Sequence, residues 1–179
     1  GIRFTITKET QDSFYAMFDL CEELKVDKLY ISHLVYSGRG KDNLEIDISK
    51  EQRKEYVEFI INKAFEYYKN GNNIDLVTGN MEMDAIMLLD RFKKEYPDFV
   101  ETLEQKLKAW GGNSAGYRLG NMDWAGNVKP DPFFPFVVGN YLETPFDEIW
   151  TSTSNEILNK LREHPRQIKG RCEECKYIE

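Results

Sequence analysis

The chain has 179 residues, of which 41% are hydrophobic and 31% charged, and its formal net charge is −7. These totals suit one globular domain, or one domain with a small appendage, and the acidic balance argues against a nucleic-acid-binding surface. No apolar run approaches the roughly 20 residues that span a bilayer, and no secretory signal pattern is visible. Three cysteines are too few for a disulfide scaffold, so we expect a cytoplasmic protein, and the start at Gly1 inside a strand pattern favours a piece of a longer one.

The first half of the chain predicts a parallel α/β sheet. Residues 2–7 and 28–33 read as strands, and residues 10–24 between them carry apolar side chains at helical spacing, among them Cys21. A strand, a helix and a strand in about thirty residues form a βαβ unit, which implies parallel strands. Further on, the pattern predicts helices over 50–69, 81–96 and 98–110 and a third strand over 74–77.

Loops at the carboxyl ends of parallel strands are where ligands bind, so the predicted strand ends are candidate site positions. Thr7, His33 and Thr78 stand there. The loop that follows the second strand adds Tyr36 and Arg39, which offer a hydroxyl and a bidentate guanidinium. A structural alternative remains open, in which the loop glycines only turn the chain, Arg39 is solvated and His33 is a structural hydrogen bonder.

The texture of the sequence changes at Gly111-Gly112, after which Gly, Asn, Asp and Pro are frequent and the helical period disappears. Residues 117–122 and 127–129 predict a short hairpin, and residues 145–150 and 154–163 predict two helices. We therefore expect a parallel α/β domain over residues 1–110 and an irregular hairpin-and-helix module over residues 111–179.

The chain closes with a Cys-x-x-Cys segment, Cys172 and Cys175. Such a turn points two sulfurs at one place, the size of a metal ion or of one corner of an iron–sulfur cluster. Either site needs four ligands, so the others lie beyond Glu179 or this is not a metal site.

Five short motifs in fixed order resemble the SPASM/twitch-type auxiliary-cluster extension of radical S-adenosylmethionine (SAM) enzymes. They are Gly-Asn-Val-Lys-Pro-Asp, Val-Gly-Asn, Pro-Phe-Asp-Glu-Ile-Trp, Leu-x-x-Leu-Arg and Gly-x-Cys-x-x-Cys. The front half resembles the second half of the radical SAM partial (β/α) barrel. Residues 33–40, His-Leu-Val-Tyr-Ser-Gly-Arg-Gly, and 111–116, Gly-Gly-Asn-Ser-Ala-Gly, are similar to the tetrapyrrole-modifying branch, which serves haem and haem d1 biosynthesis.

This resemblance implies a function and a set of ligands. It implies an enzyme that uses a 5′-deoxyadenosyl radical to modify tetrapyrrole side chains by decarboxylation or deacetylation. SAM would be contacted by Thr7, His33 and Thr78, the tetrapyrrole by Tyr36 and Arg39, and an auxiliary [4Fe–4S] cluster by Cys172 and Cys175 with ligands beyond the chain end. Electrons would come from a ferredoxin or flavodoxin.

Two departures from the family pattern qualify the resemblance. The Cys-x3-Cys-x2-Cys of the catalytic [4Fe–4S] cluster is absent and would lie before Gly1, so we expect this segment alone to be inactive. Asn121 and Asp131 stand near the places where peptide-modifying members carry hairpin cysteines, which argues against a second auxiliary cluster. The alternatives are a SPASM-type peptide-modifying maturase and a non-catalytic module with a structural zinc at the two cysteines.

Overall fold

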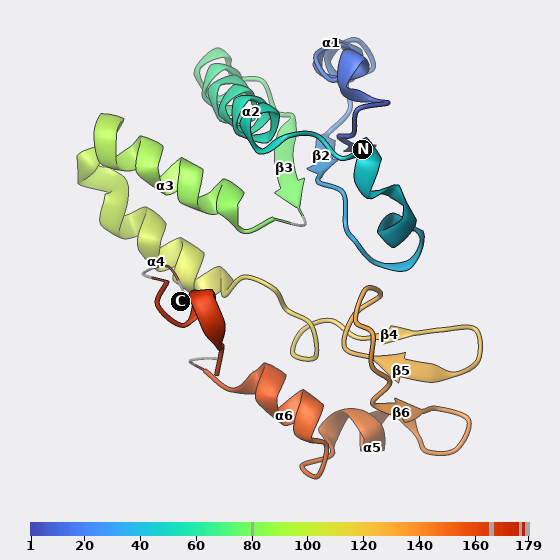
Figure 1. Cartoon of the computed structure of the whole chain (residues 1–179). Coiled ribbons are helices and arrows are strands. Elements are labelled where there is room, and N and C mark those ends of the chain that lie inside the picture. The colour runs from blue at the N-terminus through green and yellow to red at the C-terminus, as the bar shows by residue number, and fades with distance from the viewer. Residues whose placement is uncertain (80, 165–166, 176, 178–179) are drawn as a thin grey trace. The chain divides into compact units, whose positions relative to one another are not determined.

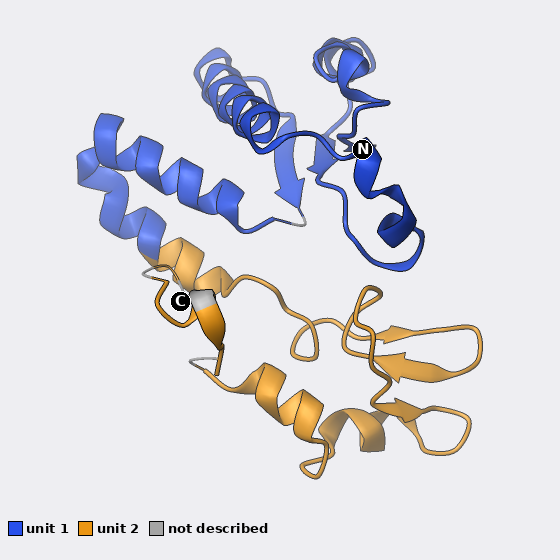
Figure 2. Ribbon diagram, viewed as in Figure 1, with its two compact units in different colours: residues 1–104 blue, residues 105–179 orange. Residues whose placement is uncertain are grey.

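The computed structural model describes residues 1–79, 81–164, 167–175 and 177. It divides the chain into two compact units, residues 1–104 and residues 105–179, which are described one at a time (Figure 2). The division falls inside a helix, six residues before the change of texture that the sequence shows after residue 110.

Unit 1 contains a three-stranded parallel sheet with the order β1-β2-β3 (Figure 1). The strands are β1 (Ile2–Thr5), β2 (Lys28–Ser32) and β3 (Asp75–Gly79). The predicted parallel arrangement is confirmed. The predicted bounds were wrong at β3, which continues through Thr78 and Gly79 because both residues pair with the end of β2.

The helices of this unit follow the predicted order. The segment predicted as one helix over 10–24 is split into η1 (Gln11–Ser13) and α1 (Ala16–Glu23). After the η2 segment (Gly38–Ile46) come α2 (Lys50–Asn70), α3 (Met83–Glu95), η3 (Pro97–Phe99) and α4 (Val100–Trp110). Ser49 and Gln52 cap the start of α2 reciprocally, and Gly71 ends it in the left-handed conformation.

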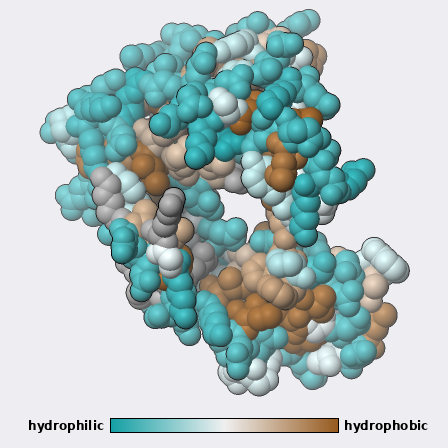
Figure 3. Space-filling model, viewed as in Figure 1, coloured by the Kyte–Doolittle hydropathy of each residue, from teal (hydrophilic) through white to brown (hydrophobic). Residues whose placement is uncertain are grey.

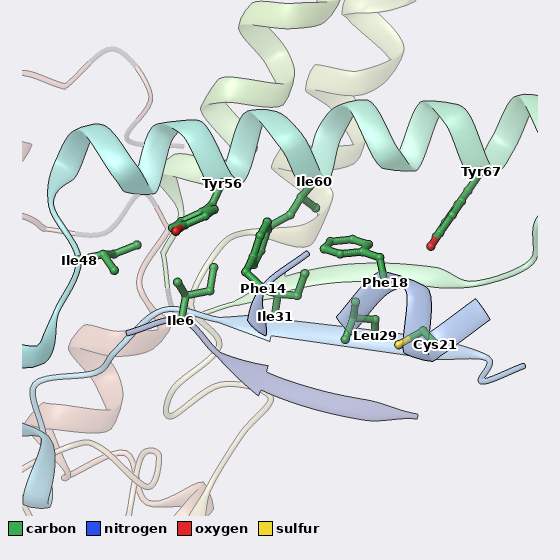
Figure 4. Close-up of a cluster of buried hydrophobic side chains, with 10 residues drawn as sticks. All are labelled: Ile6, Phe14, Phe18, Cys21, Leu29, Ile31, Ile48, Tyr56, Ile60 and Tyr67. Carbon is green, nitrogen blue, oxygen red and sulfur yellow. The ribbon is translucent and has the colours of Figure 1, made fainter. Parts of the chain in front are cut away.

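The hydrophobic core of unit 1 lies between one face of the sheet and the helices α1 and α2 (Figure 4). Leu29 and Ile31 of β2 face Phe14, Phe18 and the side chains of α2. Burial of side chains of this size contributes about 1.5–3 kcal/mol each. The fully buried members of the cluster are Ile6, Phe14, Phe18, Cys21, Leu29 and Ile31.

Unit 2 is built on an antiparallel three-stranded sheet, β4 (Asn121–Met122), β5 (Asn127–Lys129) and β6 (Gly139–Asn140). The predicted hairpin is therefore present, although its first strand is two residues long and β6 was not predicted. Two helices follow, α5 (Phe146–Thr151) and α6 (Glu156–Arg162), and then the short η4 (Gly170–Cys172). The side chains of Val128, Ile149 and Leu158 are buried.

Large apolar side chains remain at the surface of unit 2. Trp124 at the hairpin tip is 98% exposed and Leu142 is 74% exposed. Figure 3 shows apolar residues gathered over part of this unit. Among the residues that the structure describes, no helix combines the length and the apolar character that crossing a membrane requires.

Candidate functional site

The pairing register assigns the side chains of the parallel sheet to its two faces. Phe4, Ile31 and Thr78 are partners in one row, and the next row holds Thr5, Ser32 and Gly79. Ile31 belongs to the core beneath α1 and α2, so its row faces those helices. Thr78 therefore lies on the helix-covered face, whereas Thr5, Ser32 and Gly79 lie on the opposite face.

The opposite face, which does not contact α1 and α2, is largely polar and carries two cations, Arg3 and Lys28. The Arg3 guanidinium lies over the Tyr30 ring, 4.6 Å from its centroid. One row further on, the hydroxyls of Thr5 and Ser32 are hydrogen-bonded at 2.8 Å. This cluster was not predicted, since only the register of the three strands brings it together.

Gly79 completes that face by leaving room for Tyr30. A Cβ atom at residue 79 would stand 1.8 Å from the Tyr30 hydroxyl oxygen. Such an approach is far inside van der Waals contact, so any side chain here would force the tyrosine ring to move. Gly79 is thus a strand residue that sets the position of Tyr30.

His33 follows β2 directly and is buried, with 2% of its surface exposed. Its Nε2 lies 2.9 Å and 3.1 Å from the two carboxylate oxygens of Asp84, in the first turn of α3. Asp84 is itself 6% exposed. The pair joins the end of β2 to the start of α3, and sequence reasoning missed Asp84 because 51 residues separate the two positions.

Thr7 lies two residues beyond the end of β1 and is 6% exposed. Its carbonyl accepts hydrogen bonds from the backbone N–H groups of Thr10 and Gln11, and its own N–H donates to the Thr10 hydroxyl. These contacts give Thr7 a structural place in the turn that starts η1. Whether it also contacts SAM stays a prediction.

Tyr36 is half exposed, and its hydroxyl donates a hydrogen bond to the buried carboxylate of Asp47. The same carboxylate accepts a hydrogen bond of 2.6 Å from the Arg53 guanidinium in α2. Its second oxygen accepts from the backbone N–H of Ile48 at 2.9 Å. Asp47 therefore links the two ends of the loop that carries η2, through Tyr36 after β2 and through Arg53 in α2.

This network shifts the acid–base properties of its members. Burial by itself raises the pKa of Asp47, but the hydrogen bonds from Tyr36 and Arg53 outweigh it and leave the pKa of that carboxyl below its usual value. The hydrogen bond to Asp47 raises the pKa of Tyr36. The tyrosine thus keeps its proton and donates it in the hydrogen bond to Asp47.

Arg39 is exposed within η2, and the structure gives its side chain no ion pair among the described residues. Its carbonyl accepts a hydrogen bond from the Asn43 side chain. The glycines beside it are required by the backbone: Gly38 has φ of +57°, and a Cβ at Gly40 would stand 2.0 Å from the Val35 carbonyl oxygen. The turn therefore presents a guanidinium outward, as both the substrate-binding and the solvated interpretations require.

Cys172 and Cys175 are exposed and both are free thiols. The backbone N–H of Cys175 donates to the carbonyl of Cys172 at 3.2 Å, which closes a tight turn between them. Exposed thiols on such a turn suit a metal or an iron–sulfur cluster as two of its four ligands. Within the described part of the chain, no three His, Cys, Asp or Glu side chains are grouped closely enough to hold a metal ion.

Cys21 differs from the C-terminal pair in every respect that matters for ligation. It is fully buried in the core of unit 1, as the sequence predicted. Burial raises the pKa of the Cys21 thiol, which keeps it protonated.

Asn121 and Asp131, which stand near the places where peptide-modifying enzymes carry hairpin cysteines, stabilise the backbone of unit 2. Asn121 pairs with Lys129 across β4 and β5. Oδ1 of Asp131, a residue 8% exposed, accepts the backbone N–H groups of Phe133 and Phe134 at 2.6 Å and 2.7 Å. The Asp131 carboxylate therefore stabilises the turn after β5.

Comparison with known proteins gives relatives along almost the whole chain. It is 38% identical over 178 residues to the pre-heme d1 synthase of Dinoroseobacter shibae, covering 98% of this chain and 44% of the relative. It is 33% identical over 183 residues to the Fe-coproporphyrin III synthase of Methanosarcina barkeri, covering 100% and 46%. An AdoMet-dependent heme synthase of the same organism is 27% identical over 182 residues, covering 98% and 48%.

The chain thus spans less than half the length of these curated relatives. No family model matches it, and no solved structure does.

Proposed function

We propose that this chain, which belongs to the radical SAM haem-biosynthesis family of its relatives, is part of an enzyme that modifies the side chains of a tetrapyrrole by decarboxylation or deacetylation. The observation that carries the proposal is the match itself. Two synthases whose names specify tetrapyrrole products align with 98% and 100% of this chain at 38% and 33% identity. Unit 1 would then be the second half of the barrel and unit 2 the SPASM/twitch-like module.

In this enzyme SAM and a [4Fe–4S] cluster would together supply a 5′-deoxyadenosyl radical that abstracts hydrogen from the substrate. The chain's own residues would position the reactants and exclude water. The carboxyl ends of β1, β2 and β3 meet at one edge of the sheet, which supports this edge as the place where ligands approach.

The tetrapyrrole would be held through its carboxylates. Arg39 presents an exposed guanidinium from a turn whose glycines fix its course, and a guanidinium can hold a carboxylate by two parallel hydrogen bonds. Tyr36 lies three residues before Arg39 in the chain, is half exposed, and is held in place by its hydrogen bond to Asp47. Arg3, stacked on Tyr30 on the polar face of the sheet, is a further cation available to the same class of substrate.

Cys172 and Cys175 would provide two ligands of an auxiliary [4Fe–4S] cluster, with electrons delivered by a ferredoxin or flavodoxin. Their exposure and the closed turn between them support this assignment. The buried, protonated Cys21 is unsuited to it.

The test uses the full-length enzyme, purified and reconstituted with iron and sulfide without oxygen. It is incubated with SAM, dithionite and either a carboxylate-bearing tetrapyrrole or a peptide substrate mixture, and the products are identified by mass spectrometry. We expect 5′-deoxyadenosine together with a tetrapyrrole lighter by carbon dioxide or by an acetate-derived fragment. Zinc without iron in the purified protein, or a modified peptide with the tetrapyrrole unchanged, would refute the proposal.

A further inference from the structure

Unit 2 contains a surface cavity of about 220 Å³ that no residue of the proposed site lines. It lies between the carboxyl end of α4, the Gly-Gly turn that follows, and the end of α6. The lining includes Lys108, Trp110, Ser114, Tyr117, Arg118 and His164. The cavity is therefore built around the Gly-Gly-Asn-Ser-Ala-Gly stretch, whose role the site described above leaves open.

The turn that forms one wall of the cavity depends on two glycines. Gly111 and Gly112 both have left-handed backbone conformations, with φ of +74° and +66°. Two consecutive residues of this kind reverse the chain directly after α4, and a side chain at either position would be strained. The turn therefore requires glycine at both positions.

The charges of the cavity have one sign. Lys108 and Arg118 line it, and among the residues that the structure describes no aspartate or glutamate does. Neither cation has an ion pair with a carboxylate among the described residues. In a chain of net charge −7, this is a local concentration of positive charge that favours an anion.

Arg118 is held by an aromatic and a backbone contact instead. The Arg118 guanidinium lies 5.3 Å from the centroid of the Tyr117 ring, and its Nη1 donates to the Trp110 carbonyl at 3.4 Å. The Tyr117 ring in turn meets the His164 imidazole edge to face at 5.7 Å. No other acceptor for the Arg118 N–H groups occurs in the described part of the chain, so these groups can bind a ligand. The aromatic rings offer a surface to the apolar part of that ligand.

The size of the cavity limits what can enter it. Sites for drug-sized ligands occupy about 300–1,000 Å³, so a cavity of about 220 Å³ takes a fragment and not a whole macrocycle. A carboxylate on a short alkyl chain suits all three features of the cavity. Its charge can pair with the cations, its alkyl part can pack on the aromatic rings, and its size fits the volume.

We infer that the cavity at Lys108, Trp110 and Arg118 is an anion site that binds one carboxylate side chain of the tetrapyrrole, a second contact beyond the site proposed above. The identity of the ligand as a tetrapyrrole rests on the proposed function. The carboxylate chemistry of the site rests on the cavity alone. A free phosphate could satisfy the same charges, so the test separates the two anions.

The first experiment follows the Trp110 indole N–H of the full-length protein by NMR after labelling tryptophan with ¹⁵N. Trp110→Phe assigns the signal, and sodium propionate is added as the probe. We expect a saturable shift with a dissociation constant of about 1 mM, as for a weak charge-assisted contact. Lys108→Gln and Arg118→Gln should each weaken propionate binding about tenfold. Lys106→Gln changes an exposed lysine of α4 outside the cavity and should leave propionate binding unchanged.

No saturable shift with propionate, an equal affinity in Lys108→Gln, or a response to phosphate alone would overturn the inference. Because this titration involves no tetrapyrrole, it decides the carboxylate site even if the proposed function fails.

The second experiment measures the binding of coproporphyrin III and of its neutral tetramethyl ester to the full-length enzyme. We expect Lys108→Gln and Arg118→Gln to weaken coproporphyrin binding about tenfold and to leave ester binding unchanged. A parent enzyme that binds no tetrapyrrole would refute the proposed function. A parent that binds coproporphyrin III, with both variants binding it as tightly, would refute only the assignment of this cavity to the substrate.

Discussion

The imidazole of His33 and the carboxylate of Asp84 form a buried pair, with Nε2 and Oδ2 2.9 Å apart. His33 directly follows β2 and Asp84 lies in the first turn of α3, so the pair joins two elements that are far apart in the sequence. The candidate site is therefore built on a buried polar contact at the carboxyl edge of the sheet. His33 has a structural partner, whatever it does for a ligand.

Removing Asp84 should destabilise unit 1. We expect Asp84→Ala to lower the free energy of unfolding by about 1–3 kcal/mol, because the buried imidazole loses this partner in a place where water cannot replace it. Urea denaturation of the full-length apo-protein measures the change. Glu82→Ala, an exposed carboxylate two residues away, is the matched control and should have little effect. Equal stability of Asp84→Ala and the parent would contradict the structural role of the pair.

The acid stability of the protein should depend on Asp47. Its pKa is lowered in the folded state, so the unfolded chain binds the proton more readily, and the resulting stabilisation is complete above the ordinary Asp pKa of about 3.9. That stabilisation is lost as the pH falls through the folded-state value. We expect Asp47→Asn to flatten the dependence of unfolding free energy on pH below about 4, with Asp98→Asn, on the surface, as the control. An unchanged slope in Asp47→Asn would rule out this carboxylate as its source.

Gly79 should be coupled energetically to Tyr30. A methyl group at residue 79 would overlap the tyrosine hydroxyl, so Gly79→Ala should lower the free energy of unfolding by about 1–3 kcal/mol. In a Tyr30→Ala background the same change should have much less effect, since the overlapping atoms are gone. A double-mutant cycle measures the coupling. Additive effects of the two changes would mean that the backbone of β3, and not Tyr30, limits residue 79.

Iron binding should distinguish the three cysteines. In the full-length enzyme, Cys175→Ala should lose the iron of the auxiliary cluster and keep that of the catalytic one, as measured by iron analysis and electron paramagnetic resonance. Cys21→Ala is the matched control, because its thiol is buried and its pKa is raised. Iron content equal to the parent's in Cys175→Ala would remove the C-terminal site.

Arg39 should contribute to substrate binding through its fork of donors. Arg39→Lys keeps the charge and loses the bidentate geometry, so we expect weaker tetrapyrrole binding by about 1–3 kcal/mol, with SAM cleavage in the absence of substrate retained. Lys41→Gln, an exposed cation of the same η2 segment, should bind substrate like the parent. If Arg39→Lys also bound the substrate as tightly as the parent, Arg39 would be a solvated turn residue.

The sheet could be predicted because its signals are local. Alternating β-branched residues, an intervening apolar helix and the thirty-residue spacing led to the parallel arrangement that the structure has. The helix predicted over residues 50–69 agrees with α2 to within one residue, since the capping by Ser49 and Gly71 also acts over a few residues. The end of β3 was misplaced because Thr78-Gly79 resembles a turn, and only pairing with β2 makes it a strand.

The polar contacts could not be predicted because they join residues that are far apart in the sequence. Asp84 and Arg53 are charged residues near the starts of helices, and charged residues are ordinarily exposed to solvent. Each becomes buried through a partner on another element, Arg53 with Asp47 and Asp84 with His33. The clearest available signal was the position of Asp84 in the first helical turn after a strand of the sheet.

The exposure of Cys172 and Cys175 has a consequence for handling the protein in air. Two thiols on one closed turn can be oxidised to a disulfide, with loss of both S–H protons and reduction of oxygen, and the sulfurs are then no longer available to iron. Oxidation to a disulfide and binding of the proposed cluster would therefore compete for the same two sulfur atoms. The exposure of a preparation to oxygen would thus determine whether a disulfide or the proposed cluster links Cys172 and Cys175.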